Sequence, residues 1–253
     1  MPQLGLGVWQ ASPEDTEQVV RYAIDEAGYR SIDTATVYEN EEAVGRAIKQ
    51  SSVPRDDLFI TTKLWNASHG RERALAAIDA SLAALQLDFV DLYLIHWPLQ
   101  DEARLVETWQ TMIEIWRSGK ARTIGVSNFE PHHLDLLAAH TDVVPAVNQV
   151  ELHPLMQQRA LRTYAAEKGI AIESWSPLGG SGKGWGEGKT NQLLDNPVLV
   201  EIAQRYGKSV AQVIIRWHLQ SGLIVIPKSA RTPRVSENAD VSTSSSTTPP
   251  WQR

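Results

Sequence analysis

The sequence contains no cysteine in its 253 residues. Disulfide bonds, thiol catalysis and cysteine-ligated metal sites are therefore excluded. It also lacks an apolar run near the ~20 residues that a membrane-spanning helix requires, and its first residues lack the basic and then apolar pattern of a secretory signal. Positive charge is in the minority, with 24 Lys and Arg against 30 Asp and Glu, which argues against nucleic acid or an anionic membrane as a partner. We therefore predict a soluble, cytoplasmic protein.

What the sequence does contain is a regular alternation of strand-like apolar runs and helix-like segments, with one pair about every ~30 residues. The predicted strands are residues 4–8, 29–34, 58–64, 90–97, 122–127, 146–152, 170–175 and 223–227. The predicted helices are residues 12–27, 41–50, 71–87, 103–118, 131–139, 157–168 and 197–220, with a last one opening at about residue 232. Eight such pairs predict an α/β fold, a (β/α)8 TIM barrel, as a single domain over residues 1–241.

Two glycine patterns that bind nucleotides are incomplete. An open doubly wound sheet, the alternative to a barrel, needs a third glycine after the first strand, and the run LGLGVW at residues 4–9 lacks it. The GKT at residues 188–190 looks like the end of a phosphate loop, but Lys183 occupies the leading glycine position. The barrel is therefore favoured.

Residues 242–253 read STSSSTTPPWQR, a composition typical of a disordered tail.

Polar side chains stand at three successive predicted strand ends, where barrel enzymes carry their chemistry. These are Asp33, Lys63 and His96, and Tyr38 follows in the loop after Asp33. Each residue alone is more often structural than catalytic, but the four together favour a site. A tyrosine has an ordinary pKa near 10, which a nearby ammonium lowers, while a paired carboxylate keeps that ammonium charged. The pattern predicts a proton donor beside a histidine that orients a carbonyl.

Five short motifs carry a family resemblance. They are DTA with the following tyrosine (33–38), TTKLW (61–65), DLYLIHWP (91–98), GVSNF (125–129) and IPKS (226–229). In order and spacing they resemble the aldo-keto reductases, over residues 4–241. Within that family, residues 145–154 and 172–179 are most similar to bacterial 2,5-diketo-D-gluconate reductases. Relative to the family the barrel looks shortened at both ends, without the usual first hairpin and the last substrate-gripping loop.

The resemblance implies a monomeric NADPH-dependent carbonyl reductase. Tyr38 would be the general acid, tuned by Lys63 and Asp33, and His96 would orient the substrate. The resemblance also implies cofactor contacts, to the nicotinamide and its carboxamide and to the rest of NADPH/NADP+, at Ser127, Asn128, Gln149, Trp175, Ser176, Leu178, Lys228, Ser229, Arg234, Glu237 and Asn238. In relatives, the loop that corresponds to residues 179–188 folds over the pyrophosphate.

The basic turn at residues 228–234 supports an anion site independently, because a helix N-terminus flanked by cations attracts anions. A solvated basic turn is the alternative, and the resemblance favours the 2′-phosphate of NADP. Trp9, Trp65 and Trp97 are predicted to line the substrate pocket, although ordinary packing at the barrel rim would also explain them. No metal is expected, because the histidines have no carboxylate or cysteine at ligand spacing.

Three functions remain open at this point. The first is reduction of a carbonyl compound, which could be a diketo-sugar acid, a dicarbonyl or a simple aldehyde. The second is a cofactor-binding regulatory or redox-sensing barrel with little turnover. The third is an isomerase or lyase that uses Lys63 as a Schiff base, which would require the lysine to be desolvated and not paired with Asp33.

Overall fold

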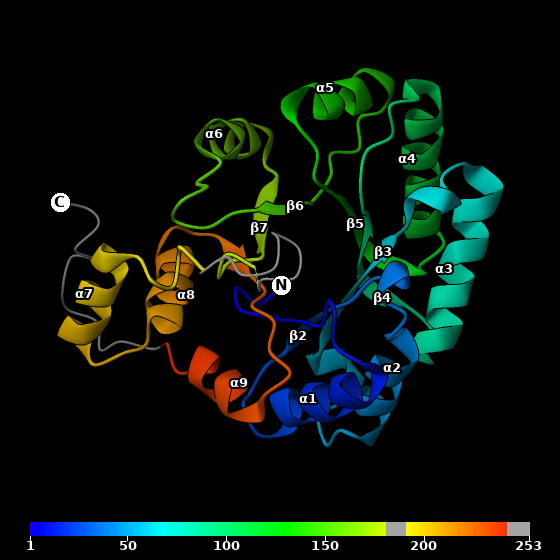
Figure 1. Ribbon diagram of the computed structural model, residues 1–253. Coiled ribbons are helices and arrows are strands. Elements are labelled where there is room, and N and C mark those ends of the chain that lie inside the picture. Colours follow the sequence, from blue (N-terminus) through cyan, green and yellow to red (C-terminus); the bar gives the residue numbers. More distant parts are fainter. Residues whose placement is uncertain (181–190, 242–253) are drawn as a thin grey trace.

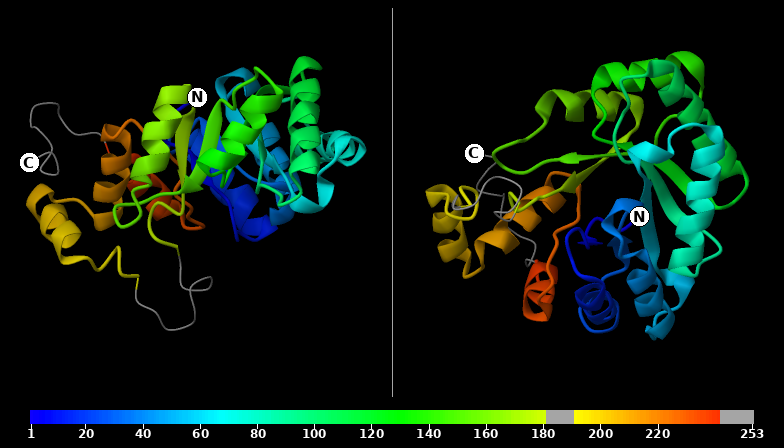
Figure 2. Two further views of the ribbon diagram at one scale, coloured as in Figure 1. Left: turned by 90° about the horizontal axis from the view of Figure 1, so that it is seen from above. Right: turned by 45° about the vertical axis from the view of Figure 1, so that its right-hand side comes forward.

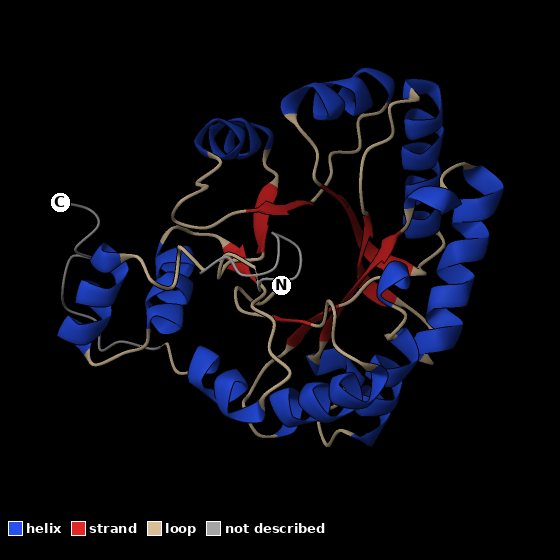
Figure 3. Ribbon diagram, in the orientation of Figure 1, coloured by secondary structure: helices blue, strands red, loops and turns tan. Residues whose placement is uncertain are grey.

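A computed structural model describes residues 1–180 and 191–241 of the chain. Its strands form one sheet in which each strand is parallel to the next, and helices surround them (Figures 1 and 3). The strands are β1 (Leu6–Gly7), β2 (Ser31–Asp33), β3 (Phe59–Leu64), β4 (Val90–Ile95), β5 (Ala121–Ser127), β6 (Val147–Glu151), β7 (Ala171–Trp175) and β8 (Ile224–Val225). The predicted tail at 242–253 and most of the loop at 179–188 lie outside the described residues.

Backbone hydrogen bonds between the first and last strands close the sheet. Gly5 N donates to Val225 O at 2.9 Å, and Gly7 N donates to Pro227 O at 3.2 Å. A side chain at Gly7 would place its Cβ 3.0 Å from the carbonyl oxygen of Ile226, so this close approach of two backbones favours glycine. The closed sheet of eight parallel strands confirms the (β/α)8 barrel.

The helices follow the strands in the order expected of repeated βα units. They are α1 (Pro13–Asp25), α2 (Glu41–Gln50), α3 (Arg71–Leu85), α4 (Glu102–Arg117), α5 (Pro131–His140), α6 (Arg159–Lys168), α7 (Pro197–Tyr206), α8 (Val210–Gln220) and α9 (Thr232–Ala239). Three 3₁₀ turns add η1 (Thr36–Tyr38), η2 (Arg55–Asp57) and η3 (Asn66–Ser68). None of the helices within residues 1–180 and 191–241 is long and apolar enough to cross a membrane.

The prediction of one continuous helical region at 197–220 is wrong, because two helices occupy that stretch. Gly207 adopts the left-handed conformation with φ of 60° and ends α7, which glycine does at little cost. Ser209 then starts α8, where its hydroxyl accepts from Gln212 N and the Gln212 side chain accepts from Ser209 N. These start and stop signals break the helix within three residues.

Apolar side chains between the strands and the helices form the main core. On α3, Ala74, Ile78, Leu82 and Leu85 share one face of the helix and are buried, whereas Leu75 is only partly buried at the edge of the same cluster. Burial of this kind is the main force that holds helices against a sheet. The packing fixes the outside of each strand and leaves the strand ends free to carry polar groups.

The last helix packs beside the first (Figure 2). The hydroxyls of Tyr22 and Ser236 lie 2.8 Å apart, and the Tyr29 hydroxyl donates to Val235 O at 3.2 Å. These contacts connect α9 to the start of the chain across the seam of the barrel. They hold the basic turn that precedes α9 next to the first strand.

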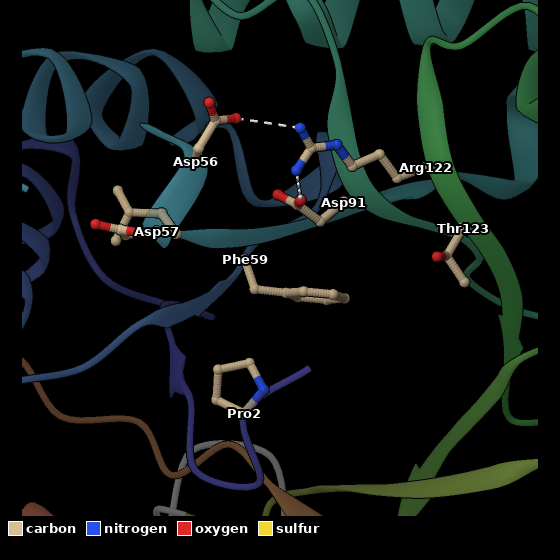
Figure 4. A pocket seen from close by; sticks show the side chains of 8 residues that line it. Pro2, Asp56, Asp57, Phe59, Asp91, Arg122 and Thr123 are labelled. Atoms are coloured by element: carbon tan, nitrogen blue, oxygen red, sulfur yellow. Dashed lines mark hydrogen bonds and ion pairs between the residues drawn. The ribbon is translucent and has the colours of Figure 1, made fainter. Parts of the chain in front are cut away.

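A hollow of about 340 Å³ lies at the amino ends of β3, β4 and β5 (Figure 4). Asp91 anchors its wall, since its carboxylate accepts from Arg55 at 2.7 Å, from Arg122 at 3.2 Å and from Ile60 N at 2.9 Å. In this fold the amino ends of the strands carry stability and the carboxyl ends carry chemistry. We therefore assign this ion-pair network to the structure of the barrel.

Candidate active site

Asp33 and Lys63 form a buried ion pair at the carboxyl ends of neighbouring strands. Asp33 is the last residue of β2, and Lys63 is the penultimate residue of β3. Lys63 Nζ donates to Asp33 Oδ1 at 2.6 Å and to Thr34 O at 2.9 Å. The Lys63 side chain is 0% exposed and the Asp33 side chain is 3% exposed. Such a pair is costly to desolvate, so its presence in a barrel interior points to a functional role.

Lys63 keeps its positive charge despite its burial. Burial by itself would lower the pKa of Lys63, but the charge and hydrogen bond of Asp33, together with smaller contributions from Tyr38 and Glu173, raise that pKa overall. An amine that attacks a carbonyl must be neutral. The paired ammonium therefore disfavours the alternative in which Lys63 forms a Schiff base.

Tyr38 ends the 3₁₀ turn η1 and lies over Lys63. The lysine Nζ is 5.1 Å from the centre of the tyrosine ring, and Thr36 in the same turn donates to Lys63 O at 3.0 Å. Burial raises the pKa of Tyr38 and Lys63 only partly offsets this. The ammonium therefore lowers the pKa of Tyr38 as expected, but desolvation of the phenolate is the larger effect and the net pKa is raised. Tyr38 consequently holds its proton at neutral pH.

His96 follows β4 and packs against two aromatic rings. Its ring centre is 5.7 Å from that of Tyr38 and 5.2 Å from that of Trp65, in both cases edge to face. Burial lowers the pKa of His96 to about 3, and the charge of Lys63 contributes. The ring is therefore neutral at neutral pH, and its Nδ1 has no hydrogen-bond partner among the described residues.

Asn40 anchors the loop that carries Tyr38, a role that the sequence pattern did not reveal. The side chain is buried. Its Oδ1 accepts from the Thr34 hydroxyl at 2.7 Å, and its Nδ2 donates to Val8 O at 3.0 Å. The only clue to this role in the sequence was the position of Asn40 at the start of α2, directly after the tyrosine loop. By joining β1 to the loop after β2, Asn40 fixes where Tyr38 stands.

The structure brings four of the predicted nicotinamide contacts together, from the ends of β5 and β7 and the middle of β6. Ser127 Oγ donates to Gln149 O at 2.8 Å, and Asn128 Nδ2 donates to Ser127 Oγ at 3.1 Å. Trp175 Nε1 donates to Asn128 Oδ1 at 2.8 Å. Asn128 Nδ2 also donates to the backbone oxygen of His96 at 3.0 Å, so this cluster adjoins the Tyr38 site.

The amide of Gln149 reaches across the barrel interior. Its Nε2 lies 2.8 Å from Asp33 Oδ2 and 2.8 Å from Glu173 Oε2. Glu173 is fully buried on β7. It was not among the site residues predicted from the sequence. The available signal was a charged residue inside the otherwise apolar strand predicted at residues 170–175.

The remaining predicted residues lie along the rim in varied settings. Lys228 and Arg234 are exposed, while Ser229 is buried and its hydroxyl accepts from Arg231 N at 3.1 Å. Leu178 packs on the apolar cluster of Ile215, Val225 and Val241. Glu237 is half-buried, Asn238 is buried, and Ser176 has a left-handed φ of 47°.

Comparison with known proteins decides the family. The model of the aldo/keto reductase family matches residues 2–248. The chain belongs to the aldo/keto reductase family. Methylglyoxal reductase DkgA of Escherichia coli (strain K12) is 54% identical over 241 residues, covering 95% of this chain and 84% of that protein.

Solved structures of other aldo/keto reductases superpose closely. The aldo/keto reductase from Brucella melitensis matches with a TM-score of 0.88 at 48% identity, over 95% of this chain and 89% of that one. The Bombyx mori aldo-keto reductase, solved in complex with NADP, matches with a TM-score of 0.88 at 39% identity, over 95% of this chain and 84% of that one.

The rim of this aldo/keto reductase suits an anionic dinucleotide. Lys228, Arg231 and Arg234 are exposed at the start of α9, and none of them forms an ion pair within residues 1–180 and 191–241. Cations at a helix N-terminus bind phosphate through charge and backbone N–H groups together. At the other end of the rim, Gln149 Oε1 accepts no hydrogen bond from any described residue. It is available to the NH2 of a carboxamide.

The three tryptophans of this family member stand at strand ends, as predicted. Trp65 contacts the His96 ring. Trp9 and Trp97 are 45% and 41% exposed, which is high for indoles and typical of a surface that another molecule covers. Their part in substrate binding stays a prediction.

Proposed function

We propose that this protein reduces aldehydes and ketones to alcohols, with NADPH as the cofactor and Tyr38 as the proton donor. The observation that carries the proposal is the buried pair of Lys63 and Asp33 beneath a protonated tyrosine and a neutral histidine. A proton donor, a fixed positive charge and a neutral hydrogen-bonding ring are the groups that carbonyl reduction needs. Membership of the aldo/keto reductase family supports it.

The cofactor is NADPH/NADP+, as in the Bombyx mori family member solved with NADP. When bound, NADPH supplies the hydride. Ser127, Asn128 and Gln149 would hold the carboxamide, and Trp175 would stack against the ring. Lys228, Ser229 and Arg234 would hold the 2′-phosphate, since charge-assisted contacts to phosphate are the strong ones.

The side chains of the site divide the remaining work. His96 donates a hydrogen bond that orients the carbonyl oxygen of the substrate. Tyr38 gives its hydroxyl proton to that oxygen as the carbonyl carbon receives the hydride, which leaves an alcohol and a phenolate. Lys63 stabilises the phenolate by its charge, and Asp33 holds Lys63 in place. Solvent then returns a proton to Tyr38, so protons balance over one turnover.

A short dicarbonyl compound is the substrate class that we propose. The Escherichia coli relative is named a methylglyoxal reductase, and the indoles of Trp9, Trp65 and Trp97 offer an aromatic surface beside His96. Diketo-sugar acids and simple aldehydes are the alternative substrates to be tested. We also propose that the protein is cytoplasmic and that it acts as a monomer, the latter because the four side chains of the site come from one chain.

The test is NADPH oxidation by the purified protein across a panel of carbonyl compounds, followed by the loss of absorbance of the reduced cofactor. We expect turnover with methylglyoxal that depends on protein concentration. Tight NADPH binding without turnover on any compound of the panel would instead favour the regulatory barrel. Gel filtration of the same sample checks the oligomeric state.

A further inference from the structure

Glu173 is a buried carboxyl group inside the barrel to which the proposed mechanism gives no task. It lies in the middle of β7, its register partners are Gln149 on β6 and Ile224 on β8, and its exposure is 0%. One carboxyl oxygen, Oε2, accepts from Gln149 Nε2 at 2.8 Å. The other, Oε1, has no hydrogen-bond partner among the described residues. A buried, half-satisfied carboxyl is costly and calls for an explanation.

Gln149 connects Glu173 to the proton-donor site. Its Nε2 donates to Asp33 Oδ2 at 2.8 Å as well as to Glu173, and Asp33 Oδ1 in turn accepts from Lys63 at 2.6 Å. Because two carboxyl oxygens face the amide, its NH2 group must point to them and its oxygen away. A continuous polar path therefore runs from Glu173 through Gln149, Asp33 and Lys63 to Tyr38.

The charges along this path do not balance if the carboxyls of Asp33 and Glu173 both ionise. Among residues 1–180 and 191–241, Lys63 is the only buried lysine or arginine, and Asp33 already neutralises it. The groups that face Glu173 are Asp33 from β2, Lys63 from β3, Tyr38 from the turn after β2 and the uncharged Gln149 from β6; Ile224, on β8, carries no charge. Burial raises the pKa of Glu173 to about 8, and the charge of Asp33 adds to this.

We propose that Glu173 is a positioning residue of the reductase: through the shared amide of Gln149 it holds Asp33 against Lys63, and its own negative charge, once formed, makes Tyr38 a weaker acid. The inference rests on the proposed function, in which Tyr38 is the proton donor. While Glu173 is neutral, Lys63 has a single counterion and can stabilise the Tyr38 phenolate. Once Glu173 ionises, a second negative charge opposes that phenolate, and Tyr38 becomes a weaker acid.

The first test is the pH dependence of kcat/KM for methylglyoxal at saturating NADPH. We expect the wild type to lose activity above about pH 8, the value at which Glu173 ionises. Glu173→Gln keeps an acceptor for Gln149 but cannot ionise, so activity at pH 7 should stay within roughly three-fold and the alkaline decline should move up by roughly one unit. Glu173→Ala loses the acceptor too and should lower kcat/KM at least ~10-fold at every pH.

Glu41→Gln is the matched control. Glu41 is also a buried carboxyl whose pKa is raised by burial and partly lowered by the charge of Lys63. It lies on α2 and accepts from Thr62 at 2.5 Å without touching Gln149, and the charges that shift the pKa of Tyr38 are those of Lys63, Asp33 and Glu173. Replacing Glu41 should leave the alkaline decline of kcat/KM at the wild-type pH. If Glu173 had only a structural role, its replacement would lower activity and stability without shifting the pH of the alkaline decline.

The second test uses the protein without cofactor or substrate. Infrared difference spectra should show the carbonyl stretch of a protonated carboxyl that disappears with a midpoint near pH 8 and is missing in Glu173→Gln. If that band is missing from the wild type, or if kcat/KM of Glu173→Gln declines at the same alkaline pH as in the wild type, the inference is overturned. Both results differ from a failure of the proposed function, which would appear as full turnover by folded Tyr38→Phe.

Discussion

The ammonium of Lys63 lies 2.6 Å from the carboxylate of Asp33, with both side chains removed from solvent. The two residues come from adjacent parallel strands, and Asp33 is the register partner of Thr61, two residues before the lysine. Side chains two residues apart on a strand point to the same face, so the lysine can reach back over the end of β2. The pair is the fixed charge around which Tyr38, His96 and Gln149 are placed.

Replacing Tyr38 with phenylalanine tests the proton donor. The change removes one hydroxyl and leaves the ring that packs edge to face on His96, so NADPH binding should persist. The rate of reduction should fall at least ~10²-fold, the low end of general-acid contributions. Steady-state kinetics and NADPH fluorescence titration measure the two quantities. Near-normal turnover in a folded variant would assign the donor to another group.

Replacing Lys63 with methionine tests the energetics of the buried pair. The Asp33 carboxylate would be left without its counterion, which should lower the free energy of unfolding by roughly 3–5 kcal/mol. The double variant Lys63→Met, Asp33→Leu removes both charges and should recover most of that loss. Urea denaturation at neutral pH compares the two, and equal destabilisation of both variants would contradict the prediction.

Replacing Arg234 with alanine tests the 2′-phosphate site. Charge-assisted contacts to a phosphate contribute about 1.5–3 kcal/mol each, so NADPH should bind at least ~10-fold more weakly by that estimate. NADH, which lacks this phosphate, should bind with little change. Arg117→Ala is the control, because Arg117 is an exposed arginine at the end of α4. Equal losses for the two cofactors would remove Arg234 from the phosphate site.

The raised pKa of Glu173 also predicts a pH dependence of stability. In the unfolded chain the carboxyl ionises near its ordinary value of 4.5, whereas burial in the folded barrel keeps it neutral until about pH 8. The contribution of Glu173 to stability is therefore fully present below pH 4.5 and is lost as pH rises to about 8.

Glu173→Gln isolates this effect. The free energy of unfolding of the variant relative to wild type should increase between pH 5 and pH 8, measured by urea denaturation at each pH. The same comparison for Glu26→Gln, an exposed carboxyl directly after α1, controls for the change of a carboxylate to an amide. A difference between Glu173→Gln and wild type that does not change with pH would show that Glu173 is already ionised at pH 5.

The sequence by itself predicted the barrel and singled out the four residues of the candidate site, Asp33, Tyr38, Lys63 and His96. Strand and helix periodicities are local, and in a parallel barrel every strand end arrives at the same rim. The placement of Asp33, Lys63 and His96 at successive strand ends was therefore enough to bring them together. Local signals at Gly207 and Ser209 were also in the sequence, and the break between α7 and α8 could have been predicted from them.

Only the tertiary structure decided the protonation state of the site and the residues that support it. Gln149 meets Asp33 across 116 positions of sequence, and no local pattern encodes a contact of that range. The same holds for Asn40, which joins the end of β1 to the loop after β2, and for Glu173 on β7, which faces the charges of Asp33 on β2 and Lys63 on β3. Tyr38 keeps its proton because burial outweighs the nearby ammonium. Desolvation depends on everything packed around a group, so it exists only once the chain has folded.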